Sequence, residues 1–337
     1  MMLGIEVTPE QVLIYRFEII EDSPTTITDD DFKEHNIGVF KAHFGQCPST
    51  LCIIWQDILN CTNKDLGLCP SDRSKEGLKR LLVAIHSLAS VTGISTRRDQ
   101  DDNLWHWMKV LWALEAKVIS WSQKEYKQKN YGPGRKFILT VEGADLKILY
   151  WPEKEYNHSG RTILLTVDGV DFRTFERSTD DYNVDKKQYS HKFHHGALKY
   201  EIGADAFLPK IVWIHGPWRA GMHDRAIFAE GGGLREKIPE GKVIICNRVY
   251  KDKKHKDNDE LMLPCVGDSS RLFTFKSCLR SRHESLNGRL KDYSILLDTY
   301  QHDPDNHVYA FEAVAVLVQY AMDHGHPIFE ANTVPPD

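Results

Sequence analysis

Hydrophobic residues recur at helical spacing through much of the first third of the chain, over residues 31–122. In "SKEGLKRLLVAIHSLASVTG" the apolar residues share one helical face: Leu78, Leu81, Leu82, Ile85 and Leu88. A further helix is expected in "DNLWHWMKVLWALEAKVISW", where we interpret Trp105, Trp107 and Trp112 as core packing. The pattern therefore predicts an all-α domain at residues 31–122, with residues 1–30 as an N-terminal extension.

Two of the expected helices are short and close together, within "DDDFKEHNIGVFKAHFGQCPSTLCIIWQDIL". Gly45 can end the first helix, and Pro48 and Ser49 stand where the second would begin. This arrangement suits a DNA-binding helix-turn-helix, but it also suits any helical hairpin. DNA recognition by this domain is therefore one of two open interpretations.

The pattern changes after residue 136 to short β-branched runs separated by turns. The runs are "FILTV", "ILLTV", "ALKYEIGAD", "KIVWIHG" and "KVIIC". Helical stretches are expected at about 224–238, 280–291 and 307–324. Strands that are later mixed with helices predict an α/β sheet domain.

Composition narrows the function classes only slightly. The 337 residues carry a net charge of −5, which neither indicates nor excludes DNA binding through a local basic face. We expect no membrane span, because no apolar run approaches the roughly 18 residues required. The start of the chain lacks a secretory pattern, and the seven cysteines form no disulfide framework. These features favour a nuclear or cytoplasmic protein that is not secreted.

A tandem duplication lies where the two predicted domains meet. Residues 117–146 align with residues 147–172 at 12 identical positions out of 26, once residues 127–130 are set aside. Both copies end in a strand that carries an acid before glycine, Glu142 in the first and Asp168 in the second. The second copy runs directly into the following strands, so we expect Asp168 to occupy a site and Glu142 to lie outside it.

Three carboxylates in the second half are candidates for a metal site. Asp168 ends an apolar strand, Asp224 stands at a probable helix start, and Glu284 lies on a helix rich in arginine. Magnesium ions prefer hard oxygen ligands brought together from distant parts of a chain. Each residue also has a simpler interpretation: Asp168 as a turn residue, Asp224 as a helix N-cap and Glu284 as part of a surface ion-pair network.

The order of several motifs resembles that of Harbinger-type DDE transposases, which are DDE superfamily endonucleases. The motifs are "TVDGVDF", "YSHKFHHGALKYEIG", "IVWIHGPWRAGMHDRAIF", "KVIICNRVY" and "RSRHESLNGRLKDYSIL". The resemblance implies an RNase H-like catalytic domain, which we assign to residues 147–330, with a mixed sheet flanked by helices. It makes Asp168 the first catalytic acid and Glu284 the last, with Asp224 at an accessory position in or beside the site.

The sequence departs from the family at the second catalytic acid. The family has an aspartate after the strand "KVIIC", whereas this chain has Asn247, and Val249 stands where the family has glycine. Asparagine offers a carbonyl oxygen but no charge, and two nearby divalent ions need anionic ligands to offset their repulsion. The substitution therefore predicts an impaired metal site.

The resemblance also implies a cofactor and partners. Two Mg²⁺ or Mn²⁺ ions would be held by Asp168, Glu284 and position 247, and the enzyme would cleave and join DNA at transposon ends and at a target. The implied contacts to the DNA backbone are Arg280, Arg282, Arg289, Lys291, Lys192 and His195. Harbinger-type systems also use a separate Myb-like DNA-binding protein.

Two other functions compete with a DDE nuclease. The first is a non-catalytic DNA-binding or scaffold protein derived from a transposase, which Asn247 and the duplication favour. The second is an unrelated metal hydrolase that uses His191, His194 and His195, although these residues lack the spacing of zinc ligands.

Overall fold

The structure of the chain is a computed structural model. It describes residues 7–20, 29–61, 68–90, 98–114, 157–158, 161–175, 188–230, 233–238, 242–250, 260–265 and 267–330. The chain divides into two compact units. Unit 1 contains residues 1–118, 290–298 and 309–326, and unit 2 contains residues 119–289, 299–308 and 327–337. The first copy of the duplication, with Glu142, lies outside the described residues.

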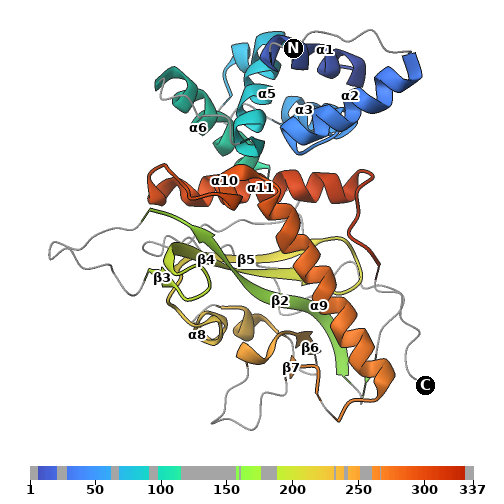
Figure 1. Cartoon of the computed structure of the whole chain (residues 1–337), viewed down its shortest axis with the longest axis vertical. Coiled ribbons are helices and arrows are strands. Elements are labelled where there is room, and N and C mark those ends of the chain that lie inside the picture. The colour runs from blue at the N-terminus through green and yellow to red at the C-terminus, as the bar shows by residue number, and fades with distance from the viewer. Residues whose placement is uncertain are drawn as a thin grey trace, which may run out of the picture. The chain divides into compact units, whose positions relative to one another are not determined.

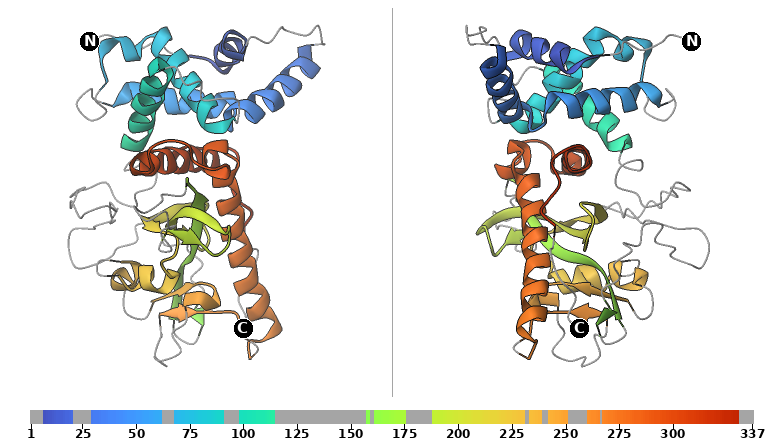
Figure 2. Two further views of the ribbon diagram at one scale, coloured as in Figure 1. Left: turned by 60° about the vertical axis from the view of Figure 1, so that its left-hand side comes forward. Right: turned by 90° about the vertical axis from the view of Figure 1, so that its right-hand side faces the viewer.

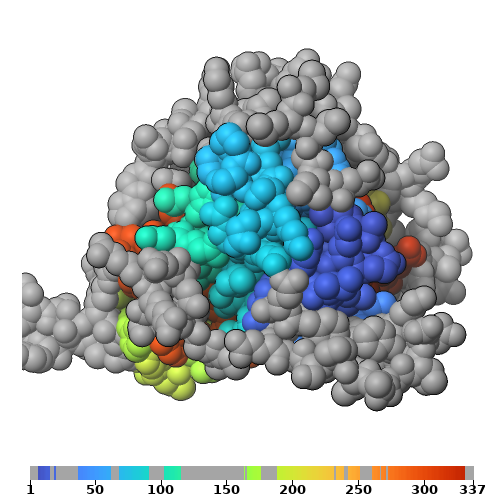
Figure 3. Space-filling model, turned by 90° about the horizontal axis from the view of Figure 1, so that it is seen from above, coloured from blue at the N-terminus to red at the C-terminus, as the bar shows by residue number. Residues whose placement is uncertain are grey.

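Unit 1 is helical in the part that the structure describes. Its N-terminal elements are α1 (Pro9–Ile20), α2 (Asp29–Phe44), α3 (Pro48–Asn60), η1 (Pro70–Arg73), α5 (Lys75–Ala89) and α6 (Arg98–Ala113). On the face seen in Figure 3, α5 lies between α1 and α6. Ser74 caps α5 by accepting a hydrogen bond from the Gly77 backbone N–H, and the apolar face predicted for this helix is buried.

The turn between α2 and α3 forms as the sequence predicts. Gly45 follows α2 with a φ of +66°, which glycine adopts without steric cost, and Pro48 is the first residue of α3. The Gln46 amide donates to the Tyr293 hydroxyl at 2.7 Å and to the Leu317 carbonyl at 2.8 Å. This turn is therefore anchored on the residues from 290–326 that belong to the same unit.

Helix α3 has few of the features of a DNA-recognition helix. It contains no lysine or arginine, and the apolar residues along it are mostly buried. Its Asp57 carboxylate accepts a hydrogen bond from the Tyr320 hydroxyl at 2.6 Å. Since a recognition helix presents polar and basic side chains to the major groove, the α2–α3 pair fits a packed helical hairpin better than a helix-turn-helix.

Unit 2 is built on a mixed β-sheet. The strands are β1 (Asn157–His158), β2 (Arg161–Arg173), β3 (Tyr189–Ser190), β4 (His195–Asp205), β5 (Ile211–Arg219), β6 (Lys242–Ile245) and β7 (Leu261–Met262). Strand β2 is central: β4 pairs with it antiparallel on one side and β6 pairs with it parallel on the other. Strands β3 and β5 both pair antiparallel with β4, and β7 pairs parallel with β6.

Helices cover both faces of this sheet (Figures 1 and 2). Helix α9 (Ser270–Lys291) packs on one face through Leu272, Phe275 and Leu279. The other face carries α8 (Asp224–Phe228), η2 (Leu234–Lys237) and η3 (Arg248–Tyr250). The helix predicted at 224–238 is thus two short elements, and the one predicted at 280–291 begins ten residues earlier.

The remaining helices are α10 (Ser294–Leu297), η4 (Pro304–Asn306) and α11 (His307–Asp323), which matches the helix predicted at 307–324. Residues 290–298 and 309–326 belong to unit 1, although the sequence assigns them to the predicted catalytic domain. None of the described helices is long and apolar enough to span a membrane. The seven cysteines are free thiols.

Candidate active site

Strands β2 and β6 and helix α9 bring three of the predicted site residues into one pocket. Thr166 of β2 pairs with Ile245 of β6 in parallel register, so the residues two positions beyond each, Asp168 and Asn247, also lie side by side. Glu284 reaches the same pocket from α9. The pocket is lined by Thr166, Val167, Asp168, Ile245, Asn247, Arg280, His283 and Glu284.

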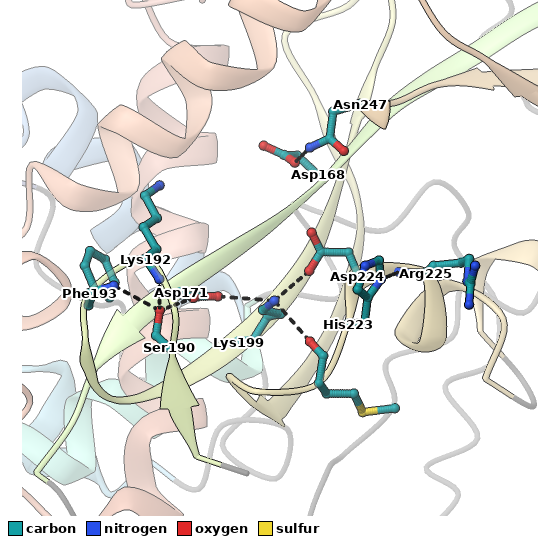
Figure 4. Close-up of polar contacts among 11 residues, drawn as sticks. Asp168, Asp171, Ser190, Lys192, Phe193, Lys199, His223, Asp224, Arg225 and Asn247 are labelled. Atoms are coloured by element: carbon teal, nitrogen blue, oxygen red, sulfur yellow. Dashed lines mark hydrogen bonds and ion pairs between the residues drawn. The ribbon is translucent and has the colours of Figure 1, made fainter. Parts of the chain in front are cut away.

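Asn247 binds Asp168 directly. Its Nδ2 donates to Asp168 Oδ1 at 2.8 Å (Figure 4). Its Oδ1 accepts from the Val249 backbone N–H at 2.9 Å. A backbone N–H can only donate, so the second bond fixes which end of the amide faces which partner. The Asn247 side chain therefore presents hydrogens, not an oxygen, to the Asp168 carboxylate.

The Asp168 carboxylate lies in an unusual electrostatic environment. Burial, and then the negative charge of Asp224, raise the pKa of Asp168 to about 6, while a backbone hydrogen bond and the cations Arg280 and Lys192 act in the opposite direction. A perturbed carboxyl in a pocket is typical of functional sites, although structural networks produce it as well. The neighbours of the Asp168 carboxylate decide which of the two cases applies.

Glu284 stands at the rim of the pocket. Its side chain is 64% exposed, and its Oε1 lies 3.6 Å from the Arg280 guanidinium one helical turn earlier on α9. The structure thus contains the surface ion pair that was the simpler interpretation of Glu284. It also places Glu284 on the wall of the pocket that contains Asp168.

Asp224 lies on the opposite face of β2 from Asp168 (Figure 4). A Cβ atom built on Gly169 would come within 2.7 Å of Asp224 Oδ1, and consecutive residues of a strand point to opposite faces. The Lys199 ammonium donates to Asp224 Oδ1 at 2.7 Å and to the Met222 carbonyl at 3.1 Å. The helix N-cap is His223, not Asp224.

A charged network that the sequence pattern did not indicate surrounds Lys199. The Lys199 ammonium also lies 3.7 Å from Asp171 Oδ1, and Asp171 Oδ2 accepts a 2.5 Å hydrogen bond from the buried Ser190 hydroxyl. Asp171 and Lys199 are directly opposite each other on β2 and β4. A charged residue on each of two strands with a buried face is the signal that would have indicated this pair.

His283 is a second residue that the sequence analysis missed. It is buried on α9 beneath the pocket, and its Nδ1 lies 2.8 Å from the Thr166 hydroxyl. Burial lowers the pKa of His283 to about 4, so this imidazole is neutral at physiological pH. The contact joins α9 to β2 beside Asp168 and Glu284, in the lining of the same pocket.

The six residues predicted to bind DNA do not form one surface. Arg282 is 2% exposed, and its guanidinium donates to the carbonyls of Asp205, Phe207 and Phe329. Arg289 donates to the Pro327 carbonyl at 2.8 Å. Arg282 therefore has a structural role, because its hydrogen-bonding groups face backbone oxygens inside the protein.

The other predicted DNA contacts remain compatible with phosphate binding. Arg280 lines the pocket with a side chain that is 40% exposed, and Lys192 is exposed. His195 is half-buried, and its Nδ1 lies 3.2 Å from the Gly196 carbonyl. Lys291 is half-buried at the last residue of α9. Arg280 and Lys192 are the two that lie close enough to influence Asp168.

The side chains at this site do not fit a pair of divalent ions. Among the described residues, no group of three or more histidine, cysteine, aspartate or glutamate side chains is arranged to hold a metal. Asp168 and Glu284 share the pocket, but Asp224 is on the other face of the sheet and Asn247 turns N–H groups toward Asp168. Divalent ions of this kind require several oxygen ligands, most of them anionic.

Part of the second half of the chain matches a known protein family. Residues 167–319 match the DDE superfamily endonuclease family, and the matched segment includes Asp168, Asn247 and Glu284. No curated protein and no solved structure matches the chain significantly. A mixed sheet flanked by helices fits a DDE nuclease domain, and such domains generally act on DNA with divalent metal ions.

Proposed function

We propose that residues 147–330 form an RNase H-like DDE nuclease domain of the Harbinger type, derived from a transposase, whose metal-dependent cleavage of DNA is impaired. The observation that carries this proposal is the hydrogen bond from Asn247 to Asp168 at 2.8 Å. It occurs inside the segment that matches the DDE superfamily endonucleases, at the position where the resemblance described above implies the second catalytic aspartate.

The order of the strands supports the RNase H-like assignment. Among the described strands longer than two residues, Asp168 lies on the first, β2, and Asn247 follows the fourth, β6. Glu284 lies on the later helix α9. The resemblance implies this same distribution for the three catalytic acids, and the parallel pairing of β2 with β6 places the first two together.

Electrostatics explain why a single amide impairs the site. A cation that approaches Asp168 meets the partial positive charge of the Asn247 amide hydrogens instead of a second carboxylate. Turning the amide round would present its oxygen, but this would break the bond from the Val249 N–H. Loss of that bond costs about 1 kcal/mol or more, and the rotated amide still contributes no negative charge.

The experiment compares the wild type with Asn247→Asp, with Glu284→Ala and with the double variant Asn247→Asp/Glu284→Ala. Nicking of supercoiled plasmid DNA is measured in Mg²⁺ and in Mn²⁺, and Mn²⁺ binding is measured by calorimetry. We expect the wild type neither to bind Mn²⁺ nor to nick DNA, and Asn247→Asp to do both. The double variant should again show neither Mn²⁺ binding nor nicking. Wild-type nicking that disappears in Glu284→Ala would contradict the proposal.

The second candidate function is a non-catalytic protein, either DNA-binding or a scaffold. Helix α3 favours the scaffold, because it lacks basic residues and its Asp57 is bonded to Tyr320. The same observation supports a system in which a separate Myb-like protein recognises the DNA, as in Harbinger-type elements. In either case we propose a nuclear location.

A further inference from the structure

A short hairpin beside the pocket carries five aromatic or imidazole rings and one lysine. The histidine hairpin, residues 189–195, reads "YSHKFHH" and connects β3 to β4. His191, Lys192 and His194 are exposed, while Tyr189, Phe193 and His195 are half-buried. The pairing Tyr189↔Gly196 and Ser190↔His195 closes the hairpin. Apart from Lys192 and His195, which the resemblance implies as DNA contacts, its side chains have no role in the function proposed above.

The hairpin is held in one conformation from beneath. Its buried Ser190 hydroxyl accepts hydrogen bonds from the Lys192 N–H at 3.2 Å and the Phe193 N–H at 3.3 Å, and it donates to Asp171. Asp171 is in turn paired with Lys199, the cation that also holds Asp224 (Figure 4). This chain ties the turn to the central strand β2, so binding at the hairpin costs little ordering entropy.

The rings of the histidine hairpin contact one another and nearby cations. The Arg173 guanidinium lies 4.7 Å from the centre of the Phe193 ring, and the Lys192 ammonium lies 6.0 Å from it. The Tyr189 ring lies 6.2 Å from that of His191 and 6.3 Å from that of His194. Stacking platforms combined with cations are the chemistry that proteins use to bind unpaired nucleotides.

The position of the hairpin relative to the pocket supports a nucleic-acid ligand. Lys192 is one of the two cations that lower the pKa of Asp168. Arg173, which stacks on Phe193, lies five residues beyond Asp168 on β2, roughly 17 Å away at 3.4 Å per residue and on the opposite face of the strand. Lys192 is therefore the residue that links the histidine hairpin to the pocket, and Phe193 follows it directly in the turn.

We infer that the histidine hairpin binds single-stranded DNA, with Phe193 and its neighbours stacking on unpaired bases and Lys192 and Arg173 contacting phosphates. In a duplex the faces of the bases are already stacked and hidden from such rings, so the surface selects unpaired nucleotides. The inference rests on the proposed function in that DNA is the ligand, but it does not depend on whether the site can cut.

The test measures binding alone, in EDTA, so that cleavage cannot contribute. Fluorescence anisotropy of the full chain is recorded with a labelled 20-nucleotide oligothymidine and with a 20-base-pair duplex. We expect Phe193→Leu to weaken binding of the single strand about tenfold and binding of the duplex less than twofold. Phe273→Leu, at a phenylalanine of α9 that is 46% exposed, is the matched control and should change neither affinity.

A second variant removes only charge from the exposed turn. Lys192→Gln should reduce the slope of log affinity against log salt by roughly 0.7 for the single strand, the value for one lost phosphate contact. The inference is overturned if the wild type binds no single strand, or if Phe193→Leu binds it as the wild type does. Equal losses with the duplex and the single strand would overturn it as well. Activity of Asn247→Asp in the nicking assay is a separate result, so each proposal can fail without the other.

Discussion

Two arginines two residues apart on α9 should behave in opposite ways when each is replaced by methionine. The Arg282 guanidinium is buried and donates to the carbonyls of Asp205, Phe207 and Phe329. Arg282→Met leaves three backbone carbonyls without these donors, and methionine occupies most of the space of the aliphatic stem. Hydrogen bonds to a charged group contribute about 1.5–3 kcal/mol each, and the losses are not additive. We expect a loss of roughly 3–5 kcal/mol in the free energy of unfolding.

Arg280→Met is the matched control. The Arg280 side chain is 40% exposed, and its ion pair with Glu284 spans 3.6 Å at the surface, so the stability change should stay below about 1 kcal/mol. Differential scanning fluorimetry should show a fall in Tm of roughly 10 °C for Arg282→Met and almost none for Arg280→Met. Anisotropy with a 20-base-pair duplex should show the reverse order, with weaker binding for Arg280→Met. An Arg282→Met protein with unchanged stability and weakened DNA binding would refute the structural role assigned to Arg282.

The remaining predictions concern the sheet face opposite the pocket. Gly169→Ala should lower the free energy of unfolding by about 1–3 kcal/mol, because its Cβ would lie 2.7 Å from Asp224 Oδ1. Urea unfolding should show that the loss caused by this alanine largely disappears when Asp224 is also replaced, in Gly169→Ala/Asp224→Gly. Burial raises the pKa of Glu201 to about 8, against an ordinary value near 4.5. Above the ordinary pKa the unfolded chain ionises while the folded protein keeps Glu201 protonated, so the free energy of unfolding falls as the pH rises toward 8. Between pH 6.5 and 8 the free energy of unfolding of the wild type should fall by about 2 kcal/mol. That of Glu201→Gln should fall much less, and this variant keeps an acceptor for the Trp213 indole. Equal pH profiles for the two proteins would contradict this assignment.

The sequence by itself determined the local elements and the chemistry at single positions. The leucines of α5 are buried as their spacing predicts, and Gly45 and Pro48 bound the turn between α2 and α3. The presence of asparagine at position 247 is also a fact of the sequence, and the order of the motifs indicated the family that residues 167–319 match. These features are local because helix periodicity, capping and turn conformation depend on neighbours in the chain.

Only the tertiary structure decided which of the charged residues share a site. Asp168 and Asp224 lie on opposite faces of β2, because the chain after β5 brings Asp224, at the start of α8, against Gly169. The two segments are more than 50 residues apart in the sequence. Arg282, which was predicted to contact DNA, is a core residue because it donates to three carbonyls from other segments. The orientation of the Asn247 amide, on which the proposed impairment rests, depends on one bond to Val249 and one to Asp168. Burial and hydrogen-bond partners set the role of a charged group, and both arise from packing between elements that are distant in the sequence.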